Sequence, residues 1–391
     1  MSTLRDLWSL DPQVRFLNHG SFGAAPRVVL EEQQAWRVRL ERQPVKFMAR
    51  EAEGLLDAAR GVLGEFVGAD SCDLAFLPNA THGLNTILRS LKFSPGDEIL
   101  TTSHGYNAAR TAATFACDRA RARVVEVTIP FPISGPEAVC EAVAAGFSER
   151  TRLLLIDHIT SPSGLVFPIA ELVALAHERG IEVLVDGAHA PGMIPLDLSA
   201  LNADYYTGNC HKWLCSPKGA AFLHVRRDRQ AKIRPLAISH GANDESKGRS
   251  RFRLEFDWTG SADPSSYLCV PGAIHFLGEL FTGGWDALYA HNRALALSAR
   301  KQMADALEVE VPAPDSMIGN LAAVTLPRRS PLGPRESDPL QVWLREVHRI
   351  EIPVVSFPGG RVIRMAAQAY VIPDEVDALA GALRVWRAEQ S

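Results

Sequence analysis

Between residues 74 and 225, short apolar runs alternate with stretches of helical periodicity. The runs at 152–156 (RLLLI) and 181–185 (IEVLV) are almost continuously apolar, and the stretch between them at 168–179 has apolar residues at helical spacing. Strands buried on both faces have this composition, because helices cover both sides of a parallel sheet. We therefore predict an α/β fold with a mainly parallel, seven-stranded sheet. Its strands are expected at residues 74–77, 98–102, 123–128, 152–156, 181–185, 203–207 and 220–225.

The pattern changes after about residue 283, where longer helical stretches are separated by a few short strands. A chain of 391 residues also exceeds the usual size of one domain. We predict a large α/β domain at residues 16–282 and a smaller α+β domain at 283–391, which residues 1–15 join. In the smaller domain we expect helices at 287–306, 340–349 and 373–387 and strands at 321–326 and 362–366.

The composition is that of an ordinary globular protein, with 47% hydrophobic and 22% charged residues. A formal net charge of −4 gives no indication of a nucleic-acid or membrane partner. No apolar run is long enough to cross a bilayer, and the first ten residues do not resemble a secretion signal. The six cysteines form no C-x-x-C pair, so neither a zinc ribbon nor a redox motif is expected. A cytoplasmic location is the default expectation.

Two residues at the ends of neighbouring predicted strands indicate the chemistry. Asp186 ends the strand at 181–185, and Lys212 follows the next strand, 26 residues later (212 − 186 = 26). A lysine alone is usually a surface residue, and a carboxylate at a strand end could cap a helix or bind a metal. Together they are the two groups that pyridoxal 5′-phosphate (PLP) requires: a lysine for its aldehyde and a carboxylate for its pyridine nitrogen.

A phosphate site is predicted separately in the segment LPNATHG at 77–83, which follows a strand and opens a helix. Backbone N–H groups at a helix N-terminus, assisted by the Thr81 hydroxyl, bind anions. Asn and Thr are also common helix caps, so this segment supports a phosphate site only in combination with Asp186 and Lys212.

Five segments together point to a known family. They are FLNHGSFG at 16–23, NAT at 79–81, DHITSPSG at 157–164, DGAH at 186–189 and GNCHKW at 208–213. These segments resemble the class V aminotransferase family of PLP enzymes, in its isopenicillin N epimerase-like branch, which is related to the cysteine desulfurases. The resemblance covers almost the whole chain. It implies the PLP-dependent transferase fold type I, an amino-acid substrate, and a homodimer with composite active sites.

The resemblance also implies the residues that hold the cofactor. Lys212 would carry PLP, Asp186 would pair with the pyridine nitrogen, and His189 would lie near the ring hydroxyl. The phosphate would be bound by the Ala80 backbone and the Thr81 hydroxyl, and by a second group of residues. That second group comprises Asn209 and His211, together with Ser261 reaching across from the neighbouring subunit.

Further roles follow from the same resemblance. Tyr106 would stack on the cofactor and is also a candidate proton carrier, with His104 as the alternative stacking ring. Arg364 would bind the substrate carboxylate, because a guanidinium grips a carboxylate with two hydrogen bonds. In the N-terminal loop, Asn18, His19 and Phe22 would face the substrate.

The reaction remains open among three chemistries that begin alike at the α-carbon: an epimerase or racemase, a carbon–sulfur β-elimination lyase, and an aminotransferase. The epimerase is preferred on the branch resemblance.

The segment 351–361 contains no cysteine, which argues against a desulfurase, and Cys210 and Cys215 are expected to be packing residues. The histidines match no zinc motif, and no G-x-G-x-x-G turn follows an early strand. A non-enzyme would not be expected to keep Lys212 and Asp186.

Overall fold

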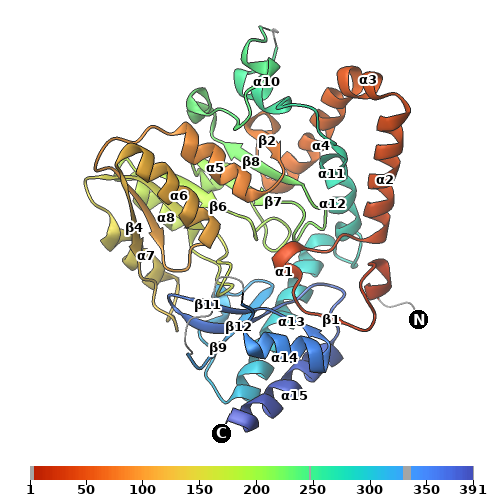
Figure 1. The fold of residues 1–391 in the computed structure, drawn as a ribbon, viewed down its shortest axis with the longest axis vertical. Coiled ribbons are helices and arrows are strands. Elements are labelled where there is room, and N and C mark those ends of the chain that lie inside the picture. The colour runs from red at the N-terminus through yellow and green to blue at the C-terminus, as the bar shows by residue number, and fades with distance from the viewer. Residues whose placement is uncertain (1–3, 246–247, 329–335, 391) are drawn as a thin grey trace.

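The computed structural model describes residues 4–245, 248–328 and 336–390. Its centre is a seven-stranded sheet in the order β2-β8-β7-β6-β5-β3-β4 (Figure 1). Strand β8 is antiparallel to both of its neighbours, and the other pairs are parallel, which confirms the mainly parallel sheet. The strands are β2 (Leu74–Leu77), β3 (Glu98–Thr102), β4 (Arg123–Val127), β5 (Thr151–Asp157), β6 (Glu182–Asp186), β7 (Tyr205–Asn209) and β8 (Ala221–Val225).

Helices cover both faces of this sheet, as its continuously apolar strands require. On one face, α5 (Ala80–Ser90) and α6 (Asn107–Ala120) enclose one apolar cluster. On the other, α4 (Ala52–Val67), α7 (Pro136–Gly146) and α8 (Ile169–His177) belong to the main cluster. Helix α5 lies unusually close to β7, because a Cβ at Gly83 would stand 2.3 Å from Thr207 Oγ1.

The C-terminal part contains a three-stranded antiparallel sheet in the order β11-β12-β9, which lies below the large sheet in Figure 1. The pairing of β1 (Arg15–Phe16) with β10 (Ile350–Glu351) attaches the N-terminal segment to this part. One apolar cluster contains residues from both parts, so the division into two domains stays a prediction. The remaining elements here are β9 (Leu321–Leu326), β11 (Val354–Phe357), β12 (Gly360–Ala366), α13 (Gly284–Leu307), α14 (Pro339–His348) and α15 (Pro373–Gln390).

The other helices are mostly short. Helix α2 (Arg27–Arg42) is joined to α4 through α3 (Pro44–Lys46) and a π-helical turn at Phe47–Glu51. Between residues 226 and 282 the three α-helices have seven, four and nine residues, which is too short for a clear helical periodicity. In chain order, the other helices are α1 (His19–Phe22), α2 (Arg27–Arg42), α3 (Pro44–Lys46), α9 (Leu198–Leu201), α10 (Arg251–Asp257), α11 (Ser265–Leu268) and α12 (Val270–Gly278).

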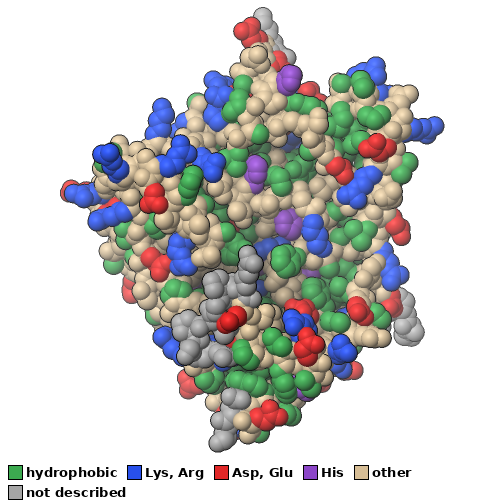
Figure 2. Space-filling model, in the orientation of Figure 1, with side chains coloured by type: hydrophobic (Ala, Val, Ile, Leu, Met, Phe, Trp, Pro, Cys, Tyr) green, Lys and Arg blue, Asp and Glu red, His purple; other side chains and the backbone are tan. Residues whose placement is uncertain are grey.

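The surface shows acidic and basic side chains mixed on the face seen in Figure 2, with histidines near its centre. Within the described residues, no helix is both long enough and apolar enough to cross a membrane.

Candidate active site

The carboxyl ends of the parallel strands surround a cavity of about 360 Å³. Ligands of α/β sheets bind at this edge, because the strand ends and the following helix N-termini converge there. Its wall includes Ser21, Phe22, Pro78, Asn79, Ala80, Thr81, Tyr106, Asp157, Ile159, Ser161, Asp186, Ala188, His189, Asn209, His211, Lys212 and Gly219.

Lys212 lies just beyond the end of β7, with its amine directed to this cavity. The protein around the amine disfavours the charged form, so burial lowers the pKa of Lys212 to about 8. The positive charge of Arg364 acts in the same direction, whereas Asp186 and Asp157 oppose it. The N-terminal loop packs directly against this segment: Gly23, at φ +71°, would place a Cβ 2.0 Å from the His211 carbonyl oxygen. The lysine is therefore held on a tightly packed backbone.

Two buried carboxylates stand side by side at the ends of β5 and β6. Asp157 and Asp186 are register partners in the parallel pair, and their exposed fractions are 4% and 3%. Asp186 Oδ1 accepts a hydrogen bond from the Ala188 N–H at 3.0 Å. Burial raises the pKa of both groups, and the Asp186 charge raises the pKa of Asp157 further. A carboxylate in this position would gain strongly from a cationic partner such as a protonated ring nitrogen.

His189 lies between the Lys212 amine and the buried indole of Trp213. Its Nε2 lies 3.0 Å from Lys212 Nζ, and its Nδ1 accepts a hydrogen bond from the Trp213 indole N–H at 3.3 Å. Burial lowers the pKa of His189 well below the usual value, so the ring is neutral. His189 is thus close enough to the lysine to contact any group bound there.

The predicted phosphate site lies where α5 begins. Asn79 caps the helix by accepting from the His82 N–H at 2.9 Å. The Ala80 N–H donates to Asn209 Oδ1 at 2.8 Å, so this amide is already engaged and Thr81 is the residue we propose for the phosphate. His211 Nδ1 donates to the Ala220 carbonyl at 2.8 Å, and burial lowers its pKa to about 4.

The two candidate stacking rings occupy different places. Tyr106, just before α6, forms part of the cavity wall and is 44% exposed. His104 is fully buried, with its ring centroid 5.6 Å from that of Phe131 and 4.8 Å from that of Phe357. The Nδ1 of His104 lies 2.7 Å from Ser163 Oγ. Of the two, the structure puts Tyr106 at the cavity.

The N-terminal residues proposed for the substrate side are also separated. Phe22 lies on the cavity wall and is 75% exposed. Asn18 accepts from the Ser21 hydroxyl at 2.6 Å. His19 is fully buried behind the lysine, where its Nε2 lies 3.0 Å from the Lys212 carbonyl oxygen and its Nδ1 lies 2.9 Å from Tyr370 Oη. The position of His19 suits support of the lysine backbone better than contact with a substrate.

Arg364, on β12, is a buried cation beside the wall of the cavity. Its guanidinium donates to the Ser161 carbonyl and to Ser161 Oγ at 3.4 Å, and Ser161 is part of the cavity wall. Among the described residues Arg364 forms no ion pair, its Nε has no hydrogen-bond partner, and burial lowers its pKa to about 10. A buried unpaired charge is costly, and a carboxylate entering the cavity would offset that cost.

A larger cavity, of about 490 Å³, lies apart from the strand ends, near α4 and α10. Its charged groups are paired with one another: Arg60 contacts Asp57 at 2.7 Å and Asp257 at 2.8 Å. The described residues that line this cavity do not include the lysine, the helix cap or the unpaired groups of the first cavity. We therefore propose that the active site is the cavity at the carboxyl ends of the strands. In the part of the chain that the structure describes, no cluster of three His, Cys, Asp or Glu side chains is suited to a metal.

Known proteins resemble this chain over most of its length. The family model for class-V aminotransferases matches residues 23–328. The chain belongs to the class-V aminotransferase family. It is 35% identical to the isopenicillin N epimerase of Streptomyces clavuligerus, over 96% of this chain and 95% of that one. It is 29% identical to a probable chloroplastic L-cysteine desulfhydrase of Arabidopsis thaliana, over 95% of this chain and 83% of that one.

Solved structures match the fold. A mutant of C-DES with glycine covalently linked to its PLP superposes with a TM-score of 0.83 at 22% identity, covering 98% of this chain and 99% of that one. A cysteine desulfurase from Thermococcus onnurineus gives 0.80 at 16% identity, covering 100% and 99%. The protein is a PLP-dependent enzyme of fold type I, as the sequence predicted.

The cofactor suits the residues at the cavity: a lysine amine, a buried carboxylate that forms no ion pair with the residues the structure describes, and a helix N-terminus with a threonine. Bound PLP supplies an electron sink for the substrate's α-carbon. Three further residues of this region were not predicted as site residues: Asp157, Ser161 and Trp213. Asp157 ends a strand as Asp186 does, so its position held a usable signal, whereas the contacts of Ser161 and Trp213 depend on tertiary packing.

Proposed function

We propose that the protein is an amino-acid epimerase or racemase. Inversion at the α-carbon requires one group to remove the proton and a second group to return it on the opposite side. The observation that carries the proposal is that Lys212 and Tyr106 enter one cavity from the ends of different strands, β7 and β3. The similarity to isopenicillin N epimerases over nearly the whole chain supports the same reaction.

In this proposal each residue has one task. Asp186 keeps the ring nitrogen of the cofactor protonated, and Thr81 with His211 holds its phosphate. Arg364 binds the substrate carboxylate from the small sheet. Lys212 removes the α-proton, and the Tyr106 hydroxyl donates one from the other side.

The test is proton NMR of the PLP-loaded protein in deuterated water with a panel of L-amino acids. We expect loss of the α-proton signal together with appearance of the D-form. Tyr106→Phe should still exchange the α-proton through Lys212, but should form the D-isomer roughly 100-fold more slowly. Lys212→Ala is the control and should do neither. Equal rates of D-isomer formation in Tyr106→Phe and the unmodified protein would remove Tyr106 from this role.

A carbon–sulfur lyase is the second candidate, because several relatives are described as cysteine desulfhydrases at 29–31% identity. A lyase needs no second proton carrier, since the β-substituent leaves instead. The same NMR experiment with cysteine separates the two: pyruvate and sulfide indicate a lyase. An aminotransferase would also form a keto acid, but it would require a second keto acid to continue turning over.

We also propose that two copies form a dimer in which Ser261 approaches the partner's phosphate site. Ser261 is exposed and lies on the surface beside Arg37 and Met48, away from the cavity of its own chain. Lys212→Ala and Ser261→Glu chains should each be inactive alone, and activity should return on mixing, because a mixed dimer contains one intact site. A monomer in sedimentation, or no recovery on mixing, would contradict this arrangement.

A further inference from the structure

The indole of Trp213 is placed to determine which nitrogen of His189 carries the proton. An indole N–H is a donor only, and it lies 3.3 Å from His189 Nδ1. Nδ1 must therefore offer its lone pair. Because a neutral imidazole has one N–H, the proton of His189 resides on Nε2.

This assignment has a consequence for the lysine. His189 Nε2 lies 3.0 Å from Lys212 Nζ, so the Nε2–H is directed at the amine. An ammonium group has three donors and no lone pair, whereas a neutral amine can accept. The contact between the two nitrogens is a hydrogen bond only when Lys212 is unprotonated.

We propose that Trp213 is a positioning residue that, through the tautomer of His189, holds Lys212 as the neutral amine that reacts with the aldehyde of PLP. The inference concerns cofactor capture and holds for any of the candidate reactions. Trp213 itself touches neither cofactor nor substrate in this account.

The packing fixes the indole in place. Trp213 is fully buried, and its ring centroid lies 5.0 Å from that of His19, which also contacts the Lys212 carbonyl. Gly192, at φ +83°, would place a Cβ only 2.6 Å from the Trp213 carbonyl carbon. The Trp213 backbone is therefore closely packed, and its fully buried indole is held against His189.

The charges around Lys212 act in opposite directions on its protonation, so the tautomer of His189 can shift the balance between amine and ammonium. Arg364 favours the neutral amine of Lys212, whereas Asp186 and Asp157 favour the ammonium. Burial lowers the pKa of His189, and the positive charges of Lys212 and Arg364 and the nearby His19 lower it further. The hydrogen bond from His189 Nε2–H further stabilises the neutral amine of Lys212.

The first test needs no variant: nitrogen-15 NMR of histidine-labelled apo-protein, with His189 assigned by its loss in His189→Gln. We expect Nδ1 of His189 to have the shift of an unprotonated nitrogen and Nε2 that of a protonated one. The reverse pattern would overturn the proposal.

The second test measures how fast apo-protein captures PLP as a function of pH. Trp213→Phe keeps a ring but removes the N–H, so His189 Nε2 becomes able to accept from an ammonium. We expect the midpoint of the capture profile to rise by about one pH unit, with capture about tenfold slower at neutral pH. Trp8→Phe is the matched control, because Trp8 is also buried and donates its N–H to the Ala24 carbonyl at 3.1 Å. A folded Trp213→Phe protein with an unchanged midpoint would refute the role of Trp213.

Discussion

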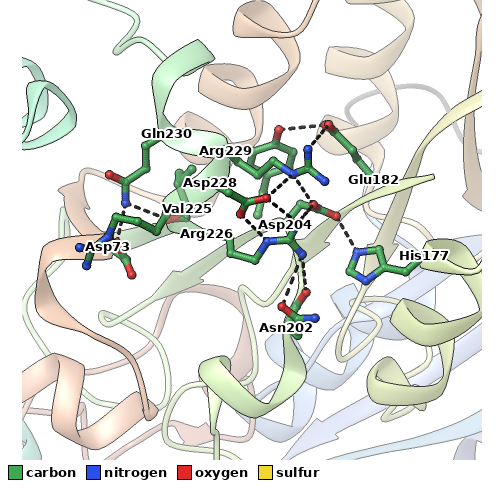
Figure 3. Close-up of polar contacts among 12 residues, drawn as sticks. Asp73, His177, Glu182, Asn202, Asp204, Val225, Arg226, Asp228, Arg229 and Gln230 are labelled. Carbon is green, nitrogen blue, oxygen red and sulfur yellow. Dashed lines mark hydrogen bonds and ion pairs between the residues drawn. The ribbon is translucent and has the colours of Figure 1, made fainter. Parts of the chain in front are cut away.

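At the amino edge of the large sheet the buried carboxylate of Asp204 contacts three basic side chains, whereas at the carboxyl edge the buried Arg364 contacts no carboxylate among the described residues. Asp204 lies 3.0 Å from Arg226, 2.8 Å from Arg229 and 2.9 Å from His177 (Figure 3). It also accepts the Val183 N–H at 2.8 Å, which ties the start of β6 to that of β7.

The carboxyl edge also contains buried carboxylates and buried basic side chains, but their pKa values are shifted toward the neutral forms. Asp157 and Asp186 have raised pKa values, and Lys212 and Arg364 have lowered ones, in each case with burial as the largest cause. Within the described part of the chain, these four groups form no ion pairs such as those of Asp204. We interpret the amino edge as the part that stabilises the fold, and the carboxyl edge as the part whose stability is reduced so that cofactor and substrate can complete it.

The largest expected effect is on catalysis at the carboxyl edge. Asp186→Ala removes the group that keeps the cofactor ring protonated, and we expect the rate of α-proton exchange to fall by roughly 1000-fold. The apo-protein should remain at least as stable, because a buried carboxylate has been removed. The rate of α-proton exchange measures the loss of catalysis, and urea unfolding of the apo-protein measures its stability. Nearly full turnover in the variant would show that Asp186 does not have this role.

At the amino edge, replacing the buried carboxylate of Asp204 should lower stability and leave cofactor binding unchanged. Asp204→Asn leaves Arg226, Arg229 and His177 without their shared anion, and we expect the free energy of unfolding to fall by about 2–3 kcal/mol. Cofactor absorbance at saturating PLP should stay unchanged. A variant as stable as the original protein would remove the contrast between the edges.

The pH dependence of the apo-protein tests the carboxyl edge through Lys212. Its pKa is about 8 in the folded state and near 10.4 when unfolded, so its destabilising effect is complete below pH 8 and disappears as the pH rises toward 10. Lys212→Met apo-protein should therefore be more stable than the original below pH 8, by about 2 kcal/mol, and the gap should close at higher pH. A gap that is constant with pH would contradict the lowered pKa.

The smallest expected effect is that of Arg364→Met. Replacing the unpaired buried cation with an apolar side chain should stabilise the apo-protein by about 1 kcal/mol. The same variant should bind amino-acid substrates at least tenfold more weakly, because the carboxylate loses its partner. Thermal unfolding and the KM for α-proton exchange measure these effects. Destabilisation without a change in KM would indicate a structural role.

The sequence predicted those features that arise from local pattern and chain order. The sheet followed from its apolar strands, and Asp186 with Lys212 followed from their places after two of them. Contacts between distant segments could not be predicted: the burial of His19 behind Lys212 depends on Tyr370, 351 residues away. The engagement of the Ala80 N–H by Asn209 likewise arises only when β2 and β7 are placed two strands apart.

The most direct test of the account is to reduce the PLP-loaded protein with borohydride and map the modified lysine by peptide mass spectrometry. We predict a single phosphopyridoxyl group on Lys212, absent in Lys212→Ala. Lys218 is the informative neighbour, because its amine donates to the Gly23 carbonyl at 3.0 Å close to the same segment. Modification of Lys218 instead, or no modification of Lys212 in a PLP-saturated protein, would contradict the assignment of the active site.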